Sequence, residues 1–344
     1  MKTEVFNAIT QKENGSRLAG RVIRDGGLVA FPTETVYGLG ANGLDGEAVK
    51  RIFEAKGRPM DNPLILHVAS KSDAKKLWSS MPEKARALMD TFWPGPLSLI
   101  YEKSERVPYE VTAGLDTVAV RMPDHKTALA FLREAEVPVA APSANLSGHP
   151  SPTTAKHVLD DLNGKVDVIL DGGPCRVGLE STVLSLVGTP TILRPGGITR
   201  EMLEAIIGHV ELAHSILSPM TEGEKPLSPG MKYKHYAPDA QVLVAEGEEK
   251  QAAQRIRRAY DLETADGKVC VIFASVQTQA FYGGRRYAII GDRTVPETFC
   301  ASLFSKLREF SGKADIIFTE ALPVQELGLA YMNRLLRAAG FQTL

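Results

Sequence analysis

The residues best suited to chemistry in this chain are cations and hydroxyls set among glycines and prolines. A predicted helix ends in Lys56 and Arg58, and a Pro-flanked loop with Asn62 follows. Cations released into such a constrained loop suit an anion, phosphate above all, because both side chains form charge-assisted hydrogen bonds to it. The alternative is a solvated helix end whose cations complement the helix dipole. Thr35 and His67 lie close by in the sequence and favour a site.

Further polar residues follow predicted strands. In TVAVR, Thr117 and Arg121 share one face because strand side chains alternate, and an Arg can hold a carboxylate through two hydrogen bonds. The turn APSANLSG supplies Ser143 and Asn145, with Ser151 beyond it. Such a turn often bonds only its own backbone. The turn is therefore ambiguous by itself.

Two more groups complete this set. Ser181 heads a predicted strand, and Arg194 precedes Pro-Gly-Gly and the start of a helix, where backbone N–H groups can bind an anion. No nucleophile is evident among these loops. The combination indicates binding and charge neutralisation of a phosphate ester beside a small carboxylate.

Motifs of several enzyme classes are absent from the sequence. It contains no GxxxxGKS/T phosphate loop, no HExxH, no GxSxG and no spaced carboxylates typical of a two-metal site. Gly38, Gly40 and Gly43 match GxGxxG, but Pro32 interrupts the strand that should lead into it, which disfavours a dinucleotide fold. The glycines are better explained by backbone that passes close to a ligand or a neighbouring strand.

Composition is that of an ordinary globular protein. The 344 residues favour two domains, and a net charge of -1 disfavours a bulk nucleic-acid binder. Cys175, Cys270 and Cys300 lack CxxC spacing, which argues against a disulfide framework or a structural zinc site. Without a signal segment or a long apolar run, the chain is predicted to be cytoplasmic and not membrane-bound.

Apolar periodicity predicts an α/β fold. Over residues 1–209, several strands follow one another directly, which favours a twisted mixed sheet with helices; Asn14 and Asp45 are expected to cap its first two helices. Residues 210–239 form a predicted linker carrying SPGMKYKHYAP, and residues 240–344 a smaller Rossmann-like α/β domain. We recognise no catalytic constellation in that second domain.

Six segments in this order, PTETVYGLG, KGRPMDNPL, TVAVRMP, APSANLSG, ESTV and RPGG, resemble the YrdC-like family of L-threonylcarbamoyladenylate synthases. SPGMKYKHYAP followed by a smaller α/β domain resembles the long, two-domain branch of that family. The resemblance implies a nucleotidyltransferase that condenses L-threonine, bicarbonate or CO2, and ATP into threonylcarbamoyl-AMP and pyrophosphate. It also implies Mg2+ with the ATP, and a product passed to a separate transferase for the N6-threonylcarbamoyladenosine (t6A) modification of tRNA.

The same resemblance assigns roles to residues. Lys56, Arg58, Ser143 and Asn145 match the catalytic set of the family. Residues matching its threonine contacts are Thr35, His67, Arg121, Ala141 and Ser181, with Arg121 taking the carboxylate. Those facing the nucleotide are Arg58, Asn62, Thr117, Ser143, Ser151, Arg194 and Tyr236. Tyr233 is a second candidate for the linker tyrosine.

These assignments fit the chemistry that the residues allow. Threonine carbamate is already an oxygen nucleophile and needs positioning against the α-phosphate and neutralisation of charge. We expect Lys56 and Arg58 to supply cations from outside the core, and the linker to close over the site and exclude water. A double-stranded RNA binder and a carbamoyl transferase using carbamoyl phosphate stay open, as do direct tRNA binding and the oligomeric state.

Overall fold

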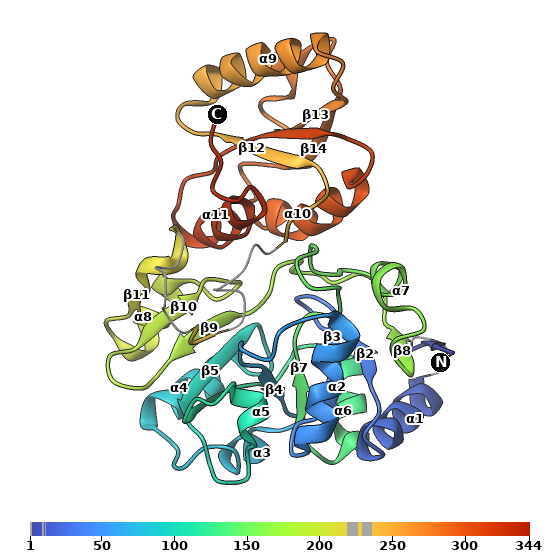
Figure 1. Ribbon diagram of the computed structural model, residues 1–344. Helices are drawn as coiled ribbons and strands as arrows, with labels where there is room; N and C mark the ends of the chain where they lie inside the picture. The colour runs from blue at the N-terminus through green and yellow to red at the C-terminus, as the bar shows by residue number, and fades with distance from the viewer. Residues whose placement is uncertain (1, 9, 11, 219–225, 229–235) are drawn as a thin grey trace. The chain divides into compact units, whose positions relative to one another are not determined.

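The chain divides into two compact units in the computed structural model, which describes residues 2–8, 10, 12–218, 226–228 and 236–344 (Figure 1). Within these ranges, unit 1 comprises residues 2–8, 10, 12–147, 151–216 and 226–228, and unit 2 comprises residues 148–150, 217–218 and 236–344. The borders expected at residues 209 and 239 stay a prediction. Among the described residues, no helix combines the length and apolarity needed to cross a bilayer.

Unit 1 is organised around a mixed sheet whose described strands run in the order β1-β8-β2-β3-β7-β4-β6-β5-β9-β10-β11. The sheet contains both antiparallel pairs, such as β4–β7, and parallel pairs, such as β4–β6, which confirms the predicted twisted mixed sheet. The strands are β1 Glu4–Asn7, β2 Val29–Phe31, β3 Gly38–Asn42, β4 Ile65–His67, β5 Leu97–Glu102, β6 Thr117–Arg121, β7 Val139–Ala141, β8 Val168–Asp171, β9 Thr182–Ser185, β10 Thr191–Arg194 and β11 Glu211–Leu212.

Helices cover this sheet. They are α1 Lys12–Arg24, α2 Gly46–Lys56, α3 Lys71–Lys75, α4 Glu83–Phe92, α5 Tyr109–Thr112, α6 Lys126–Ala135, α7 Ala155–Leu162 and α8 Arg200–Ile207. Asp45 caps α2 as predicted, because its carboxylate accepts from the backbone N–H groups of Glu47 and Ala48. The cap predicted at Asn14 is wrong: Asn14 lies inside α1, because the preceding Lys and Glu are good helix formers and extend the helix.

The glycines of the GxGxxG match form a strand and its exit. Gly40 lies in β3, where an added Cβ would come 2.6 Å from Cγ1 of Val139 in the neighbouring β7. At Gly43, an added Cβ would come 2.4 Å from Cδ2 of Leu66. The interpretation that these glycines permit close approach of a neighbouring strand is therefore confirmed.

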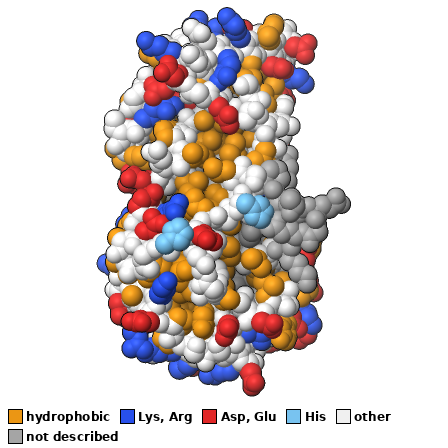
Figure 2. Space-filling view, turned by 90° about the vertical axis from the view of Figure 1, so that its left-hand side faces the viewer, with side chains coloured by type: hydrophobic (Ala, Val, Ile, Leu, Met, Phe, Trp, Pro, Cys, Tyr) orange, Lys and Arg blue, Asp and Glu red, His pale blue; other side chains and the backbone are white. Residues whose placement is uncertain are grey.

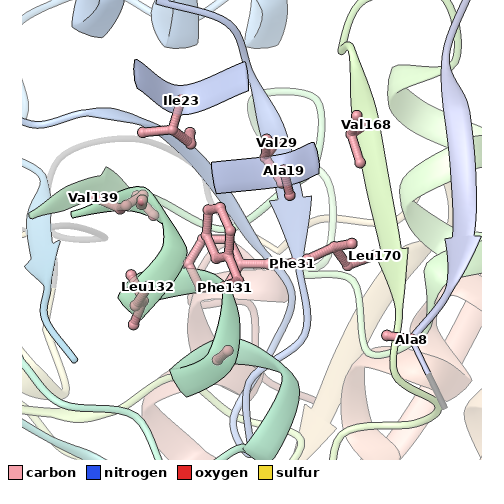
Figure 3. Close-up of a cluster of buried hydrophobic side chains, with 13 residues drawn as sticks. Ala8, Ala19, Ile23, Val29, Phe31, Phe131, Leu132, Val139, Val168 and Leu170 are labelled. Carbon is pink, nitrogen blue, oxygen red and sulfur yellow. The ribbon is translucent and has the colours of Figure 1, made fainter. Parts of the chain in front are cut away.

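A core under the sheet joins α1, α6 and the strands β2, β7 and β8. Phe31 of β2 packs against Phe131 of α6 at a ring separation of 5.1 Å, with Ile23 and Leu170 around them (Figure 3). All four side chains are fully buried. This packing holds β2 in place. The segment after β2 contains Thr33, Glu34 and Thr35, of which Glu34 and Thr35 contact Arg121.

Unit 2 contains a four-stranded parallel sheet in the order β12-β15-β13-β14. Its strands are β12 Gln241–Ala245, β13 Cys270–Ser275, β14 Tyr287–Gly291 and β15 Ile316–Glu320, and its helices are α9 Glu249–Ala265, α10 Glu297–Phe310 and α11 Glu326–Ala338. All three strand pairings are parallel, which confirms the predicted Rossmann-like alternation.

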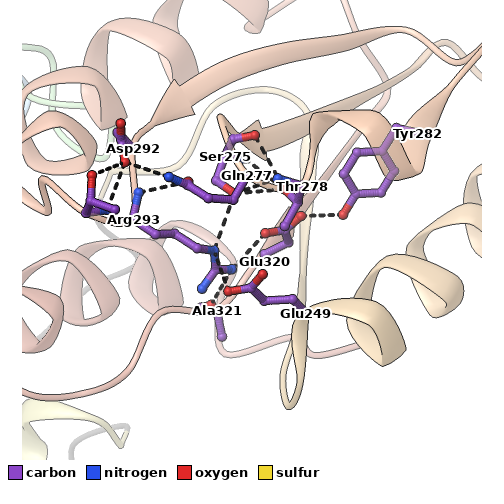
Figure 4. Close-up of polar contacts among 10 residues, drawn as sticks. Glu249, Ser275, Gln277, Thr278, Tyr282, Asp292, Arg293, Glu320 and Ala321 are labelled. Atoms are coloured by element: carbon purple, nitrogen blue, oxygen red, sulfur yellow. Dashed lines mark hydrogen bonds and ion pairs between the residues drawn. The ribbon is translucent and has the colours of Figure 1, made fainter.

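A polar cluster that sequence reasoning missed lies at the carboxyl ends of these strands (Figure 4). Arg293 Nη2 lies 2.7 Å from Oε2 of Glu320, and the Tyr282 hydroxyl donates to Oε1 of Glu320 at 2.5 Å. Glu320 is only 4% exposed, so its charge needs these partners. The cluster connects Tyr282 after β13, Arg293 after β14 and Glu320 at the end of β15, and so ties that edge of the sheet together.

Candidate active site

Lys56 is buried, contrary to the expectation that it lies outside the core. It ends α2, and the left-handed Gly57 turns the chain directly after it. Only 3% of Lys56 is exposed, and its Nζ donates to the backbone carbonyls of Ser143 at 2.5 Å and Asn145 at 2.6 Å. The ammonium group is thus directed at the turn after β7, which no local pattern could reveal.

The turn after β7 is held from two sides. The backbone N–H of Ser147 donates to the carbonyl of Lys56 at 3.0 Å, and that of Ala144 donates to the carbonyl of Tyr37 at 2.8 Å. An isolated antiparallel bridge also pairs Ser143 with Gly38. The structure therefore brings Lys56, Ser143 and Asn145, three of the four predicted catalytic residues, into one rigid assembly.

Arg58 and Asn62 form a second group in the loop after α2. The Arg58 guanidinium lies over the ring of Phe53, 5.8 Å from its centroid. With its amide oriented to satisfy both neighbours, Asn62 accepts from Arg58 Nη2 at 3.1 Å and donates to the carbonyl of Ser228 at 3.2 Å. Through this bond Ser228, the first residue of SPGMKYKHYAP, contacts the loop predicted to face the nucleotide, in which Asn62 is fully buried.

Arg121 crosses the sheet from the end of β6. Its Nη1 donates to Oγ1 of Thr35 at 3.0 Å, and its Nε donates to the carbonyl of Gly95 at 3.2 Å. Arg121 is 4% exposed and Thr35 is fully buried. Two predicted threonine contacts, far apart in the sequence, therefore touch each other.

His67 pairs with Arg121 in register, since β4 and β6 are parallel neighbours. Burial first, and then the charge of Arg121, lower the pKa of His67 to about 3. Its ring meets Phe31 edge-on at 5.7 Å, and its Nδ1 lies 3.2 Å from the carbonyl of Ile65. His67 is therefore neutral near pH 7 and can donate or accept a hydrogen bond without adding charge.

A third group joins the strands β5, β9 and β10. Arg194 donates from Nη2 to Oγ of Ser181 at 3.1 Å, and the hydroxyls of Ser181 and Ser98 lie 2.8 Å apart. Ser151 donates to Oε1 of Glu180 at 2.5 Å. Sequence reasoning missed Ser98, which carries no signal beyond a polar residue inside an apolar strand.

The remaining predicted residues are placed differently. Ala141 lies in β7 opposite Ile65, whereas Thr117 lies at the other end of β6 from Arg121. Tyr236 belongs to unit 2, where its ring lies 5.0 Å from that of Phe304. Its predicted position over the nucleotide stays a prediction, and Tyr233 lies outside the described residues.

Glu34 is a functional candidate that sequence reasoning did not select. Its side chain is 1% exposed, and its Oε1 lies 2.6 Å from Nη2 of Arg121. The available signal was its position as the one acid between Thr33 and Thr35, in a segment otherwise apolar or hydroxyl-bearing. The two opposite charges interact strongly, because the protein interior screens charge less than water does.

Two features bear on what the site can do: the distribution of charge on one face of the protein and the grouping of side chains that could bind a metal. Lys and Arg side chains are interspersed with Asp and Glu over the described part of the face drawn in Figure 2. Within the described ranges, no three His, Cys, Asp or Glu side chains come together as a metal-binding group. Fold and site together define a two-unit α/β protein whose first unit holds buried Arg, Lys and hydroxyl groups suited to small anionic substrates.

Comparison with known proteins places the chain in a family. A family model described as telomere recombination matches residues 21–196, and one described as threonylcarbamoyl-AMP synthase, C-terminal domain, matches residues 198–340. A threonylcarbamoyl-AMP synthase of Bacillus subtilis is 48% identical over 94% of this chain and 92% of its own length. One of Pyrococcus abyssi is 47% identical over 95% of this chain and 94% of its own length.

A solved structure agrees with these relatives. Sua5 of P. abyssi complexed with L-threonine matches with a TM-score of 0.91 and 45% identity, covering 100% of this chain and 98% of that one. The chain belongs to the threonylcarbamoyl-AMP synthase family, and the family resemblance of its six motifs is confirmed.

Proposed function

We propose that this chain is a nucleotidyltransferase that condenses L-threonine, bicarbonate or CO2, and ATP into threonylcarbamoyl-AMP and pyrophosphate. The observation that carries the proposal is the buried contact of Arg121 with Thr35 on the same sheet as the Lys56-anchored turn. Relatives of this name, at 47–48% identity over nearly the whole chain, support it, and so does a similar structure that binds L-threonine.

The reaction assigns a task to each group of residues. Arg121 binds the threonine carboxylate, and neutral His67 and Ser181 offer hydrogen bonds around it. The neutral α-amine forms a bond to the carbon of CO2 and gives up a proton, or displaces water from bicarbonate, to yield the carbamate. The carbamate oxygen then forms a bond to the α-phosphorus of ATP while the bond from that phosphorus to the bridging oxygen breaks, and pyrophosphate leaves with the electron pair. Arg58 and Arg194 neutralise the phosphates, whereas buried Lys56 fixes the Ser143–Asn145 turn that contacts the nucleotide.

Two parts of this proposal concern what enters and leaves the site. ATP enters as its Mg2+ complex, with the ion carried on phosphate oxygens as is usual for Mg2+. The labile product passes to a separate tRNA threonylcarbamoyl transferase for t6A synthesis. The interspersed surface charge gives no support to tRNA binding by the described part of the face in Figure 2.

Pyrophosphate release by the purified full-length chain tests the function. We expect release from ATP and Mg2+ only when both L-threonine and bicarbonate are added, with threonylcarbamoyl-AMP identified by mass spectrometry. Release that ignores threonine would contradict the proposal. Activity with carbamoyl phosphate alone, or RNA binding without release, would favour the two alternatives instead.

A further inference from the structure

The ion pair between Glu34 and Arg121 has unfilled hydrogen-bonding positions on both sides. Although Oε1 and Nη2 lie 2.6 Å apart, neither Glu34 oxygen accepts a hydrogen bond, and Nη2 donates none. A carboxylate and a guanidinium so close usually align two parallel N–H···O bonds. Three buried polar atoms without a hydrogen-bond partner in one pair indicate groups positioned for a ligand.

The surroundings of the pair keep it in this arrangement. The backbone carbonyl of Glu34 accepts from the N–H of Val177 at 2.7 Å, and the carbonyl of Thr35 accepts from Gly178 at 3.1 Å. Arg121 is held by Thr35 and by the carbonyl of Gly95. The fold around both partners therefore holds the Glu34 carboxylate and the Arg121 guanidinium out of the usual parallel arrangement.

An α-amino acid zwitterion complements such a pair. Its carboxylate can accept from the guanidinium, and its ammonium group can donate to the carboxylate. The other groups assigned to threonine include no anion: Thr35 and Ser181 are hydroxyls, and His67 is neutral. A buried ammonium group needs an anionic or hydrogen-bonding acceptor.

We propose that Glu34 accepts hydrogen bonds from the α-ammonium group of L-threonine and thereby selects an amino acid over a hydroxy acid. This inference rests on the proposed function, since it takes L-threonine as the substrate and Arg121 as its carboxylate receptor. The amine loses its positive charge when it becomes a carbamate. Glu34 therefore acts on the binding of free threonine more than on the later transfer step.

The test compares two ligands and two variants of the full-length chain. L-threonine and (2S,3R)-2,3-dihydroxybutanoate differ only in an ammonium or a hydroxyl group at the α-carbon. Glu34→Gln keeps the shape of the side chain and removes its charge, and Glu54→Gln does the same at an exposed position of α2. Calorimetry gives the affinities, and thermal unfolding shows whether each variant is folded.

We expect Glu34→Gln to weaken L-threonine binding by about 10- to 100-fold, the range for a hydrogen bond to a charged group, and to change hydroxy-acid binding by less than about threefold. In steady-state assays the KM for threonine rises while the KM for ATP and kcat change little. Glu54→Gln leaves every value as in the wild type. Equal losses for both ligands would instead assign Glu34 the lesser role of orienting Arg121, and unchanged threonine binding would also overturn the proposal.

Two further outcomes keep the test decisive. If Glu34→Gln does not fold, Glu34→Asp is tested instead, because it keeps the negative charge on a side chain one methylene shorter. An unchanged preference for threonine in Glu34→Asp would refute the inference. The second outcome separates the two proposals. If the wild type prefers threonine over the hydroxy acid, Glu34→Gln abolishes that preference, and the wild type releases no pyrophosphate, then only the proposed function is contradicted.

Discussion

Replacement of Lys56 by Met separates an anchoring role from the phosphate-binding role that the sequence suggested. The Lys56 ammonium donates to two backbone carbonyls, those of Ser143 and Asn145. A buried acceptor left without its donor costs about 1–3 kcal/mol, so two cost about 2–6 kcal/mol of unfolding free energy. Met fills most of the volume of Lys, which limits the additional cost of a cavity.

Urea unfolding followed by tryptophan fluorescence measures this loss in unit 1, because both tryptophans, Trp78 and Trp93, are buried there. With a slope of about 2–3 kcal/mol per M urea, a loss of about 2–6 kcal/mol lowers the midpoint by roughly 0.7–3 M. Lys50→Met removes a cation whose side chain is 38% exposed from the same helix and should leave the midpoint unchanged. A wild-type midpoint in Lys56→Met, combined with lost activity, would refute the anchoring role and restore the phosphate role.

Three further predictions concern charge and burial. The folded-state pKa of His67 is about 3 and its ordinary value is 6.5, so between these values the unfolded chain binds one more proton than the folded chain. The free energy of unfolding therefore rises as the pH rises from 3 to 6.5, by up to about 1.4 kcal/mol per pH unit. Between pH 5 and 7 the urea midpoint of His67→Gln should change less with pH than that of the wild type. Arg121→Lys keeps the positive charge but loses the planar guanidinium, so threonine-dependent pyrophosphate release should fall at least about tenfold while a fluorescent ATP analogue still binds. Arg86→Lys, at an exposed position, is the control. A fully active Arg121→Lys variant would exclude bidentate binding of the threonine carboxylate. Burial raises the pKa of Cys175 and of Cys300 to about 12, so neither thiol should react with iodoacetamide at pH 8 until the chain is unfolded. Peptide mass spectrometry measures the labelling of each cysteine. Rapid labelling of the native protein would contradict their burial.

Local patterns in the sequence determined much of the secondary structure and the composition of the site. The cap at Asp45, the strand Thr117–Arg121 and the four parallel strands of unit 2 follow from hydrogen bonds and apolar periodicity that extend over a few residues. The ordered motifs also indicated the family. The residue types alone, cations and hydroxyls without an evident nucleophile, were enough to predict a site that binds and neutralises a phosphate ester and a small carboxylate.

Tertiary structure alone decided which of these groups touch one another. Lys56 is buried because a turn 87–89 residues away supplies carbonyls for its ammonium group, and Arg121 meets Thr35 across 86 residues of chain. Glu34 acquires its importance only because the fold places its carboxylate against that same guanidinium. Burial and the alignment of charges depend on which strands become neighbours, and neighbours in a mixed sheet are chosen by packing of the whole unit.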